Sequence, residues 1–296
     1  MINIEPKFKA LMGWLAIVSI VVLLSSCFPK PVAKEPLAEL QQLLPTRLRS
    51  TGLLGAFEVI IHNDSAWDSL LSEMTKFDLH IDYDRIKKYC EEHWGDVLKR
   101  AGLLSNDPMR PKLRAELKLS RGNWYTVQIL GPVAGRKISQ GVYVESALYI
   151  TTSRSDAIIL EFSGGYSFIN NATQWENLTR STDIPLGFLL AAYARAGVST
   201  PSCVALLPET LSGDDLEKAL FEIGRVRGAG SIVPVFKRNE CFTNEAATHV
   251  LIKLGDTSAI EPLKALLNDS GIDWITREEI QELLGTLTSS RKGNSF

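Results

Sequence analysis

The carboxy-terminal third of the chain repeats a short helical pattern, and this repeat restricts the fold more than any other feature. The sequence "VLIKLG" (250–255) completes an apolar stripe that recurs every three or four residues and stops at a glycine. "ALFEIG" (219–224) and "IQELLG" (280–285) match it, so glycines expected to end helices recur at Gly224, Gly255 and Gly285, spaced by 31 and 30 residues. A single two-helix unit cannot cover its own apolar face, so the pattern predicts stacked helical repeats over residues 184–288.

The stretch after Gly255 predicts the second helix of one repeat. Residues 256–258 can cap this helix, and Pro262 falls in or near its first turn, where proline is tolerated. "SIVPVF" (231–236) matches "AIEPLK" (259–264) when an insertion of three residues is allowed. The pattern LGDxxAIxPLxxLL resembles HEAT-like repeats of the phycobilisome-lyase type, and this resemblance implies an all-α solenoid that binds proteins. It carries over no lyase chemistry, and a plain helical bundle is the alternative fold.

Residues 51–183 are expected to form a separate α+β domain. Apolar and polar residues alternate with a period of two over "RAELKLSRGNWYTVQIL" (114–130), which predicts a hairpin that turns at residues 121–123. Residues 142–162 predict a second hairpin that turns at 153–156. Together with amphipathic helical stretches, these hairpins predict a small antiparallel sheet with helices packed on one face.

The start of the chain predicts export. Lys7 and Lys9 precede an uncharged, apolar run of 15 residues (10–24), which has signal-peptide length and is shorter than the roughly 20 residues of a membrane-spanning helix. The sequence Leu24-Ser25-Ser26-Cys27 resembles the lipobox of bacterial lipoproteins. This resemblance implies that a signal peptide of residues 1–26 is removed and that Cys27 is acylated, which anchors the chain to a membrane. An uncleaved, single-span anchor in the inner membrane is the alternative.

Either type of anchor places the rest of the chain in the bacterial cell envelope, facing the periplasm. Phe28, and not Asp, follows Cys27, and in diderm lipoproteins this resembles the pattern of export to the outer membrane. Four prolines between Cys27 and Ser50 predict a semi-stiff tether over residues 27–50, with a short docked helix as the alternative. A polar tail, 289–296, is expected to end the chain.

Charge and cysteine spacing argue against several classes of protein. The net charge is −2 and no stretch forms a positive stripe, which disfavours nucleic-acid binding. Cys90, Cys203 and Cys241 lack CxxC spacing and are expected to be buried free thiols. A single disulfide bond between two of them is the alternative. The glycine-rich stretches lack the spacing of a phosphate cradle, so no cofactor is expected.

One stretch could hold a metal ion. In "FDLHIDYD" (77–84), the alternation would place His80, Asp82 and Asp84 along one face of a strand, where they are weak candidate ligands for a divalent cation. The polar face of any half-buried strand produces the same alternation, so an ordinary surface strand is the favoured interpretation.

A catalytic centre is not evident. Cys90 and His93 lie three residues apart on a helix predicted over residues 84–102 and could meet, but the neighbouring Trp94 indicates that this face belongs to the core. The chain is therefore predicted not to be an enzyme. An envelope enzyme of the hydrolase type, with a site in residues 51–183, is the alternative.

The favoured hypothesis is a lipid-anchored scaffold that binds another envelope protein through its helical repeats. An immunity-type inhibitor of an incoming toxin is a narrower version of the same hypothesis. Arginine and tryptophan anchor protein interfaces more often than their abundance suggests. The candidate contact residues are Arg225, Arg227, Lys237, Arg238 and Trp274.

Overall fold

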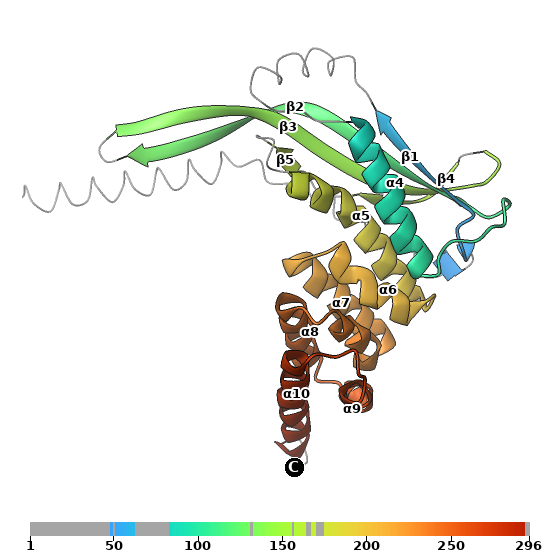
Figure 1. Cartoon of the computed structure of the whole chain (residues 1–296), viewed down its shortest axis with the longest axis vertical. Coiled ribbons are helices and arrows are strands. Elements are labelled where there is room, and N and C mark those ends of the chain that lie inside the picture. The colour runs from blue at the N-terminus through green and yellow to red at the C-terminus, as the bar shows by residue number, and fades with distance from the viewer. Residues whose placement is uncertain are drawn as a thin grey trace, which may run out of the picture. The chain divides into compact units, whose positions relative to one another are not determined.

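The structure is a computed structural model. It describes residues 48–49, 51–62, 83–130, 133–155, 157–163, 167–169 and 175–293. All of these residues belong to one compact unit, Leu37–Phe296. A β-sheet with helices against it is followed by a succession of further helices (Figure 1). The α+β expectation for the first part of this unit is therefore confirmed in outline.

The sheet is mixed, and the prediction that it is wholly antiparallel is wrong. Its strands lie in the order β1 (Ala56–His62), β2 (Lys112–Leu130), β3 (Val133–Thr151) and β4 (Ile158–Ser163), with β5 (Ser167–Ile169) also paired to β3. β1 runs parallel to β2, whereas the other pairs are antiparallel. Helix α4 (Tyr83–Arg100) lies between β1 and β2 in sequence. A crossover of this kind is what a parallel pair requires, and alternation alone does not reveal strand direction.

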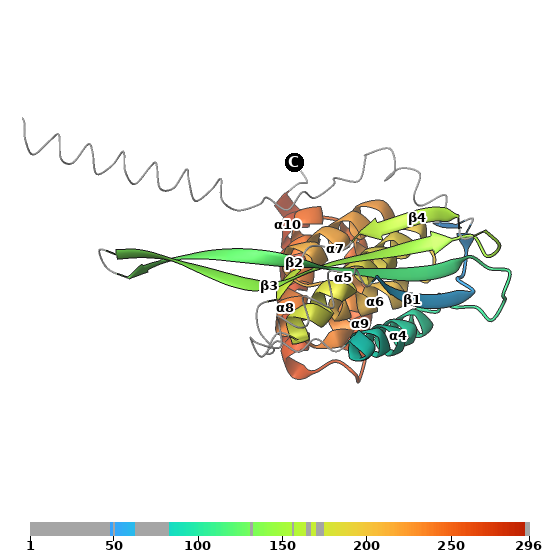
Figure 2. The same ribbon diagram turned by 90° about the horizontal axis from the view of Figure 1, so that it is seen from above.

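The first predicted hairpin is also wrong. β2 continues through residues 121–123, and its register with β3 is unbroken from Lys112↔Thr151 to Leu130↔Val133. The far halves of β2 and β3, among the described residues, pair only with each other and project from the rest of the sheet (Figure 2). The second predicted hairpin is confirmed, because β3 and β4 pair on either side of residues 152–157.

Helices α4 and α5 cover one face of the sheet. α4 contacts β1, while α5 (Trp175–Ala196) contacts β3, β4 and β5 as well as α4 (Figure 1). The buried side chains of α4 follow the predicted stripe, and Gly102 follows the helix with a φ of +67°. These buried residues are Ile86, Cys90, Trp94, Val97 and Leu98. The expected domain boundary between residues 183 and 184 falls inside α5.

Most of the remaining helices, together with α5, pack in two rows, and the short turns η3 and η5 connect them. The remaining helices are α6 (Thr200–Leu206), η3 (Leu207–Glu209), α7 (Gly213–Arg227), η4 (Ala229–Arg238), α8 (Cys241–Leu254), η5 (Thr257–Ala259), α9 (Ile260–Leu267) and α10 (Trp274–Gly293). In the first row α5, α7, α8 and α10 contact one another in turn. In the second row α6, η4 and α9 contact one another in turn. Helix pairs that follow each other in the sequence therefore also lie side by side.

Only one of the three predicted helix-ending glycines ends a helix. Gly255, with a φ of +60°, follows α8, but Gly224 lies inside α7 and Gly285 inside α10. α7 continues for three more residues and stops at Gly228, whose φ is +86°. A helix interior tolerates glycine at a cost of only about 1 kcal/mol, so the residue type alone does not mark a helix end. Pro234 follows Gly228 by six residues, and Pro262 follows Gly255 by seven. Matching these two glycines therefore reduces the predicted three-residue insertion to a difference of one residue.

Candidate functional site

The predicted contact residues do not gather in one place. They lie at the end of α7 (Arg225 and Arg227), at the end of η4 (Lys237 and Arg238) and at the start of α10 (Trp274). Arg225 pairs with Glu222 of its own helix at 2.9 Å. Lys237 pairs with Asp269 at 3.1 Å. Both cations are thus used, at least in part, within the chain.

Arg227 lines a surface depression of about 440 Å³ between the start of α6, the end of α7 and the start of η4. Its guanidinium group lies against Gly197, because a Cβ atom on that glycine would be 3.1 Å from the guanidinium carbon. Ser199, Thr200 and Ser231 contribute hydroxyl groups to the same depression. Serine and threonine hydroxyls need a neighbouring base to act as nucleophiles, and the lining contains none.

Trp274 belongs to an exposed apolar group that the sequence interpretation only half identified. Phe242 is 86% exposed, Trp274 is 71% exposed and Ile275 is 46% exposed. Cys241 is exposed as well. These four residues are the first two of α8 and the first two of α10, and we call them the apolar band. Phe242 was missed because the sequence interpretation followed the apolar stripe of α8, and Phe242 stands outside that stripe.

Hydrogen bonds hold the two halves of the apolar band together. The Asn239 side-chain amide donates to the carbonyl of Gly271 at 2.8 Å and accepts from the backbone N–H of Asp273 at 3.1 Å. The amide of Asn244 donates to Thr276 Oγ1 at 2.9 Å, and both of these residues are buried. The first turns of α8 and α10 are therefore fixed side by side.

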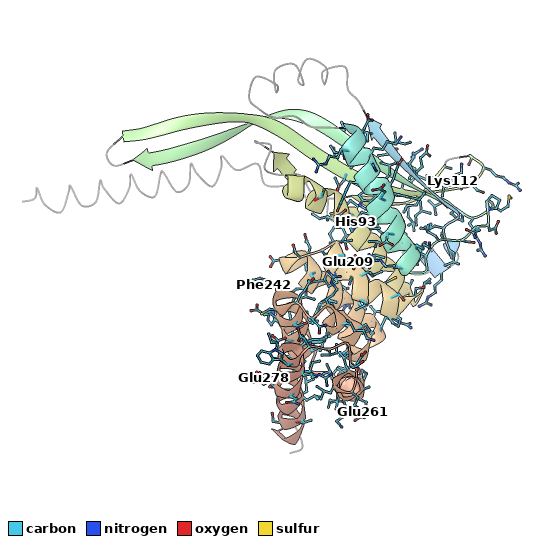
Figure 3. All side chains as sticks on the ribbon, in the orientation of Figure 1. His93, Lys112, Glu209, Phe242, Glu261 and Glu278 are labelled. Carbon is cyan, nitrogen blue, oxygen red and sulfur yellow. The ribbon has the colours of Figure 1, made fainter. Side chains whose placement is uncertain are left out.

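Two carboxylates lie next to the apolar band. Glu245 and Glu278 are exposed and follow the band by one helical turn in α8 and α10. In the part of the chain that the structure describes, neither carboxylate has an ion-pair partner. Figure 3 labels Phe242 and Glu278 on the same side of α8 and α10, whereas Glu261 lies on α9.

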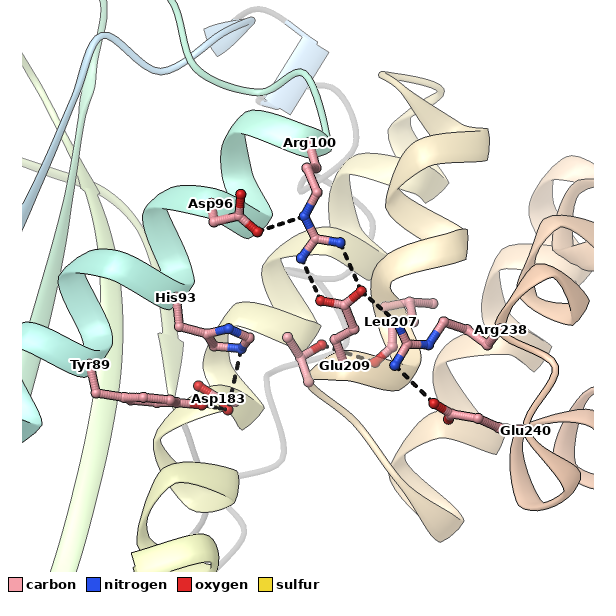
Figure 4. A network of polar contacts seen from close by, with 10 residues as sticks. Tyr89, His93, Asp96, Arg100, Asp183, Leu207, Glu209, Arg238 and Glu240 are labelled. Atoms are coloured by element: carbon pink, nitrogen blue, oxygen red, sulfur yellow. Dashed lines mark hydrogen bonds and ion pairs between the residues drawn. The ribbon is translucent and has the colours of Figure 1, made fainter. Parts of the chain in front are cut away.

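A buried carboxylate joins α4 to α5. Asp183 is 4% exposed, and it accepts hydrogen bonds from Trp94 Nε1 at 2.6 Å and from the Tyr89 hydroxyl at 2.8 Å. Figure 4 shows Asp183 beside Tyr89 and His93 of α4. His93 Nε2 lies 3.7 Å from the same carboxylate, beyond hydrogen-bonding distance. Burial raises the pKa of Asp183 to about 6, while the bonds from Trp94 and Tyr89 act to lower it. The arrangement binds two helices to each other.

The same cluster argues against a catalytic Cys90. The Cys90 side chain is fully buried, and burial raises the pKa of its thiol to about 12. A nucleophilic cysteine requires a lowered pKa and access to substrate, and Cys90 has neither. His93 lies with its ring stacked on Tyr89, the ring centroids 5.1 Å apart.

A second polar cluster links α4 to the helical rows. The Glu209 carboxylate, at the end of η3, receives hydrogen bonds from Arg100 of α4 at 2.8 Å and from Arg238 of η4 at 2.9 Å (Figure 4). Hydrogen bonding from Arg100 holds the pKa of Glu209 below its ordinary value. Arg238 also donates to Glu240 at 2.8 Å, so this predicted contact residue already forms hydrogen bonds within the chain.

The weak metal site has no support among the described residues. His80 and Asp82 lie outside them, and Asp84 is an exposed residue in the first turn of α4, on a helix and not on a strand. The described ranges contain no group of three or more His, Cys, Asp or Glu side chains that could hold a metal ion. Cys90 and Cys203 are buried free thiols, as predicted. The prediction that Cys241 is buried is wrong, because this residue is exposed at the first position of α8.

Comparisons with known proteins identify no relative. No family model, no curated protein and no solved structure matches the chain. Within the described ranges, no helix is both long and apolar enough to cross a bilayer. Cys27 and the run before it lie outside those ranges.

Proposed function

We propose that this protein is a lipid-anchored binding protein of the bacterial cell envelope, and that its helix pairs act together as a HEAT-like platform for another protein. The observation that carries the proposal is the serial packing of α5, α7, α8 and α10 in one row and of α6, η4 and α9 in the other. Stacked pairs bury a continuous core between the rows and leave the outward side of each row as an extended surface.

Exposed side chains on the first row support a binding role. Phe242 and Trp274 are large aromatic residues that a folded chain ordinarily covers, and both stand at the surface on adjacent helices. The acid, base and thiol groups that lie close together are instead engaged in helix packing, as at Asp183 and Glu209. These features favour recognition over catalysis.

The lipid anchor rests on the lipobox-like sequence that ends at Cys27. Several acyl chains on one residue hold a protein firmly at a membrane, because each buried CH₂ group contributes about 0.8 kcal/mol. Metabolic labelling with radioactive palmitate tests this step. We expect label in the wild-type chain and none in the Cys27→Ala variant, whereas an unlabelled wild-type chain would remove the lipid anchor from the proposal.

The binding role is tested by recovery of a partner. The full chain, carrying a carboxy-terminal affinity tag, is cross-linked in intact cells, extracted in mild detergent and purified. We expect one or a few envelope proteins to be recovered in stoichiometric amounts, reproducibly and only from cross-linked cells. Recovery of the tagged chain alone, together with turnover of an ester, peptide or glycan substrate by the purified protein, would favour an envelope enzyme.

A further inference from the structure

The apolar band has the composition and placement of a docking surface. Its largest members, Phe242 and Trp274, occupy the first turns of two helices that Asn239 and Asn244 hold side by side. Because these turns are fixed before any partner arrives, binding there costs little ordering of the protein. Aromatic side chains contribute the largest share of binding energy in interfaces, and these two are almost uncovered.

The charges beside the band indicate which partner fits it. Glu245 and Glu278 lie one turn beyond the band and, within the described residues, have no ion-pair partner. Glu282 is exposed one turn further along α10. A partner that covers the aromatic side chains must meet these carboxylates, and lysine or arginine side chains are their natural complement.

We infer that the apolar band, with Glu245 and Glu278, binds a basic amphipathic segment of another protein, in which apolar residues and Lys or Arg residues lie on neighbouring faces. This inference rests on the proposed function and specifies the partner class. The apolar face of the segment covers Phe242 and Trp274, and its cationic side chains reach the two carboxylates. Such a segment would bind the apolar band in the way that amphipathic helices bind hydrophobic grooves.

Two other occupants fit the charges less well. A second copy of this chain, related by a two-fold axis, would bring the same Glu245 and Glu278 toward their own counterparts, and like charges oppose that contact. A membrane surface that contains anionic lipids would likewise be repelled by the carboxylates. The basic segment is the occupant that both the apolar area and the charge favour.

The experiment uses the full lipidated chain in nanodiscs of neutral phosphatidylcholine. The probe is a fluorescent 14-residue helical peptide of leucine and lysine, with leucine at helical spacing, and a second peptide carries glutamate in place of lysine. Binding is measured by fluorescence anisotropy against empty nanodiscs.

One variant combines Phe242→Ser with Trp274→Ser, and a second combines Glu245→Lys with Glu278→Lys. A control combines Glu261→Lys on α9 with Glu91→Lys on α4, two exposed positions that lie away from the band and whose carboxylates pair with Lys264 and Lys87 of their own helices. Circular dichroism confirms that each variant is folded.

We expect the wild-type protein to bind the lysine peptide at least tenfold more tightly than the glutamate peptide. The apolar variant should lose at least tenfold in affinity, the charge-reversed variant should prefer the glutamate peptide, and the control should change by less than twofold. Equal binding of both peptides, unchanged binding by the band variants, or an equal loss in the control would overturn the inference. Self-association that Phe242→Ser abolishes would overturn it in favour of a second copy. If the wild-type protein and the band variants recover a cellular partner equally well, the proposed binding function is retained and the apolar band is not the binding site.

Discussion

The carboxylate of Asp256 accepts a hydrogen bond from the backbone N–H of Ala229, which lies 27 residues earlier in the chain, at 2.9 Å. It also accepts from the backbone N–H and the hydroxyl of Ser258, at 2.9 and 2.7 Å. One side chain therefore caps its own turn, η5, and the start of η4 in the preceding helix pair. This bond is a direct link between adjacent members of the second row.

Replacing Asp256 by alanine should destabilise the protein. Because the substitution removes the caps of two turns, we expect Asp256→Ala to lower the free energy of unfolding by about 1–2 kcal/mol at neutral pH. The bond from Ala229 lowers the pKa of Asp256. The contribution is therefore present above the unfolded pKa of about 4 and is lost as the pH falls through the lowered folded value. Urea unfolding at pH 7 and pH 3 measures both effects, and equal stability of variant and wild type at pH 7 would contradict this account of the cap.

Two glycine substitutions are expected to change stability in opposite directions. Gly285 lies inside α10 with open space where a Cβ would be, so Gly285→Ala should stabilise the protein by about 0.5–1 kcal/mol. At Gly230 of η4, a Cβ would lie 2.6 Å from the backbone oxygen of Ser258, and Gly230→Ala should destabilise the protein by about 1–3 kcal/mol. Thermal unfolding followed by circular dichroism gives the two signs. A gain in stability from Gly230→Ala would show that η4 and η5 are not in such close contact.

The buried Asp183 should give stability a recognisable pH dependence. Burial raises its pKa from 3.8 to about 6, so the folded state binds a proton more strongly than the unfolded state. The stability contributed by this group is therefore greatest below pH 4 and falls as the pH rises toward 6. We expect the difference in unfolding free energy between the wild type and Asp183→Asn to fall by about 2–3 kcal/mol from pH 4 to pH 7. A difference that stays constant over this range would contradict the assignment.

Thiol reactivity separates the buried cysteines from the exposed one. Cys90 and Cys203 are buried, and burial raises the pKa of each thiol to about 12, whereas Cys241 is exposed. In the lipidated chain at pH 8, Cys241 should react with a colorimetric disulfide reagent within seconds to minutes, and the other two only after unfolding. The Cys241→Ser variant should lose the fast phase. A fast phase that survives this substitution would place another thiol at the surface.

Local patterns predicted much of the fold, because apolar spacing reports directly which face of an element is buried. The stripe from Ile86 to Leu98 predicted α4, and the pattern around Leu263 predicted the second helix of a pair. The parallel pairing of β1 with β2 depends on a crossover, and the length of β2 depends on continued pairing past Gly122. The alternation of apolar and polar residues along one strand predicts neither the direction of its neighbour nor how far the pairing continues.

The candidate site was harder to predict than the fold. Trp274 was identified because tryptophan is a common interface anchor, but Phe242 became recognisable only when its exposure was known. Arg238 resembled a free surface cation, yet Glu209, 29 residues away, uses it in an internal cluster. The bond between Trp94 and Asp183 joins residues 89 positions apart, and no local pattern predicts such a contact.

Site-specific photo-crosslinking in intact cells tests the central claim most directly, namely that the outer side of the first helical row holds another protein. A photoreactive phenylalanine analogue is placed at residue 242 and, as a control, at residue 261 of α9. The account predicts a discrete crosslinked species containing a second, different protein from residue 242 and none from residue 261. No crosslink from residue 242, or the same products from both positions, would contradict it.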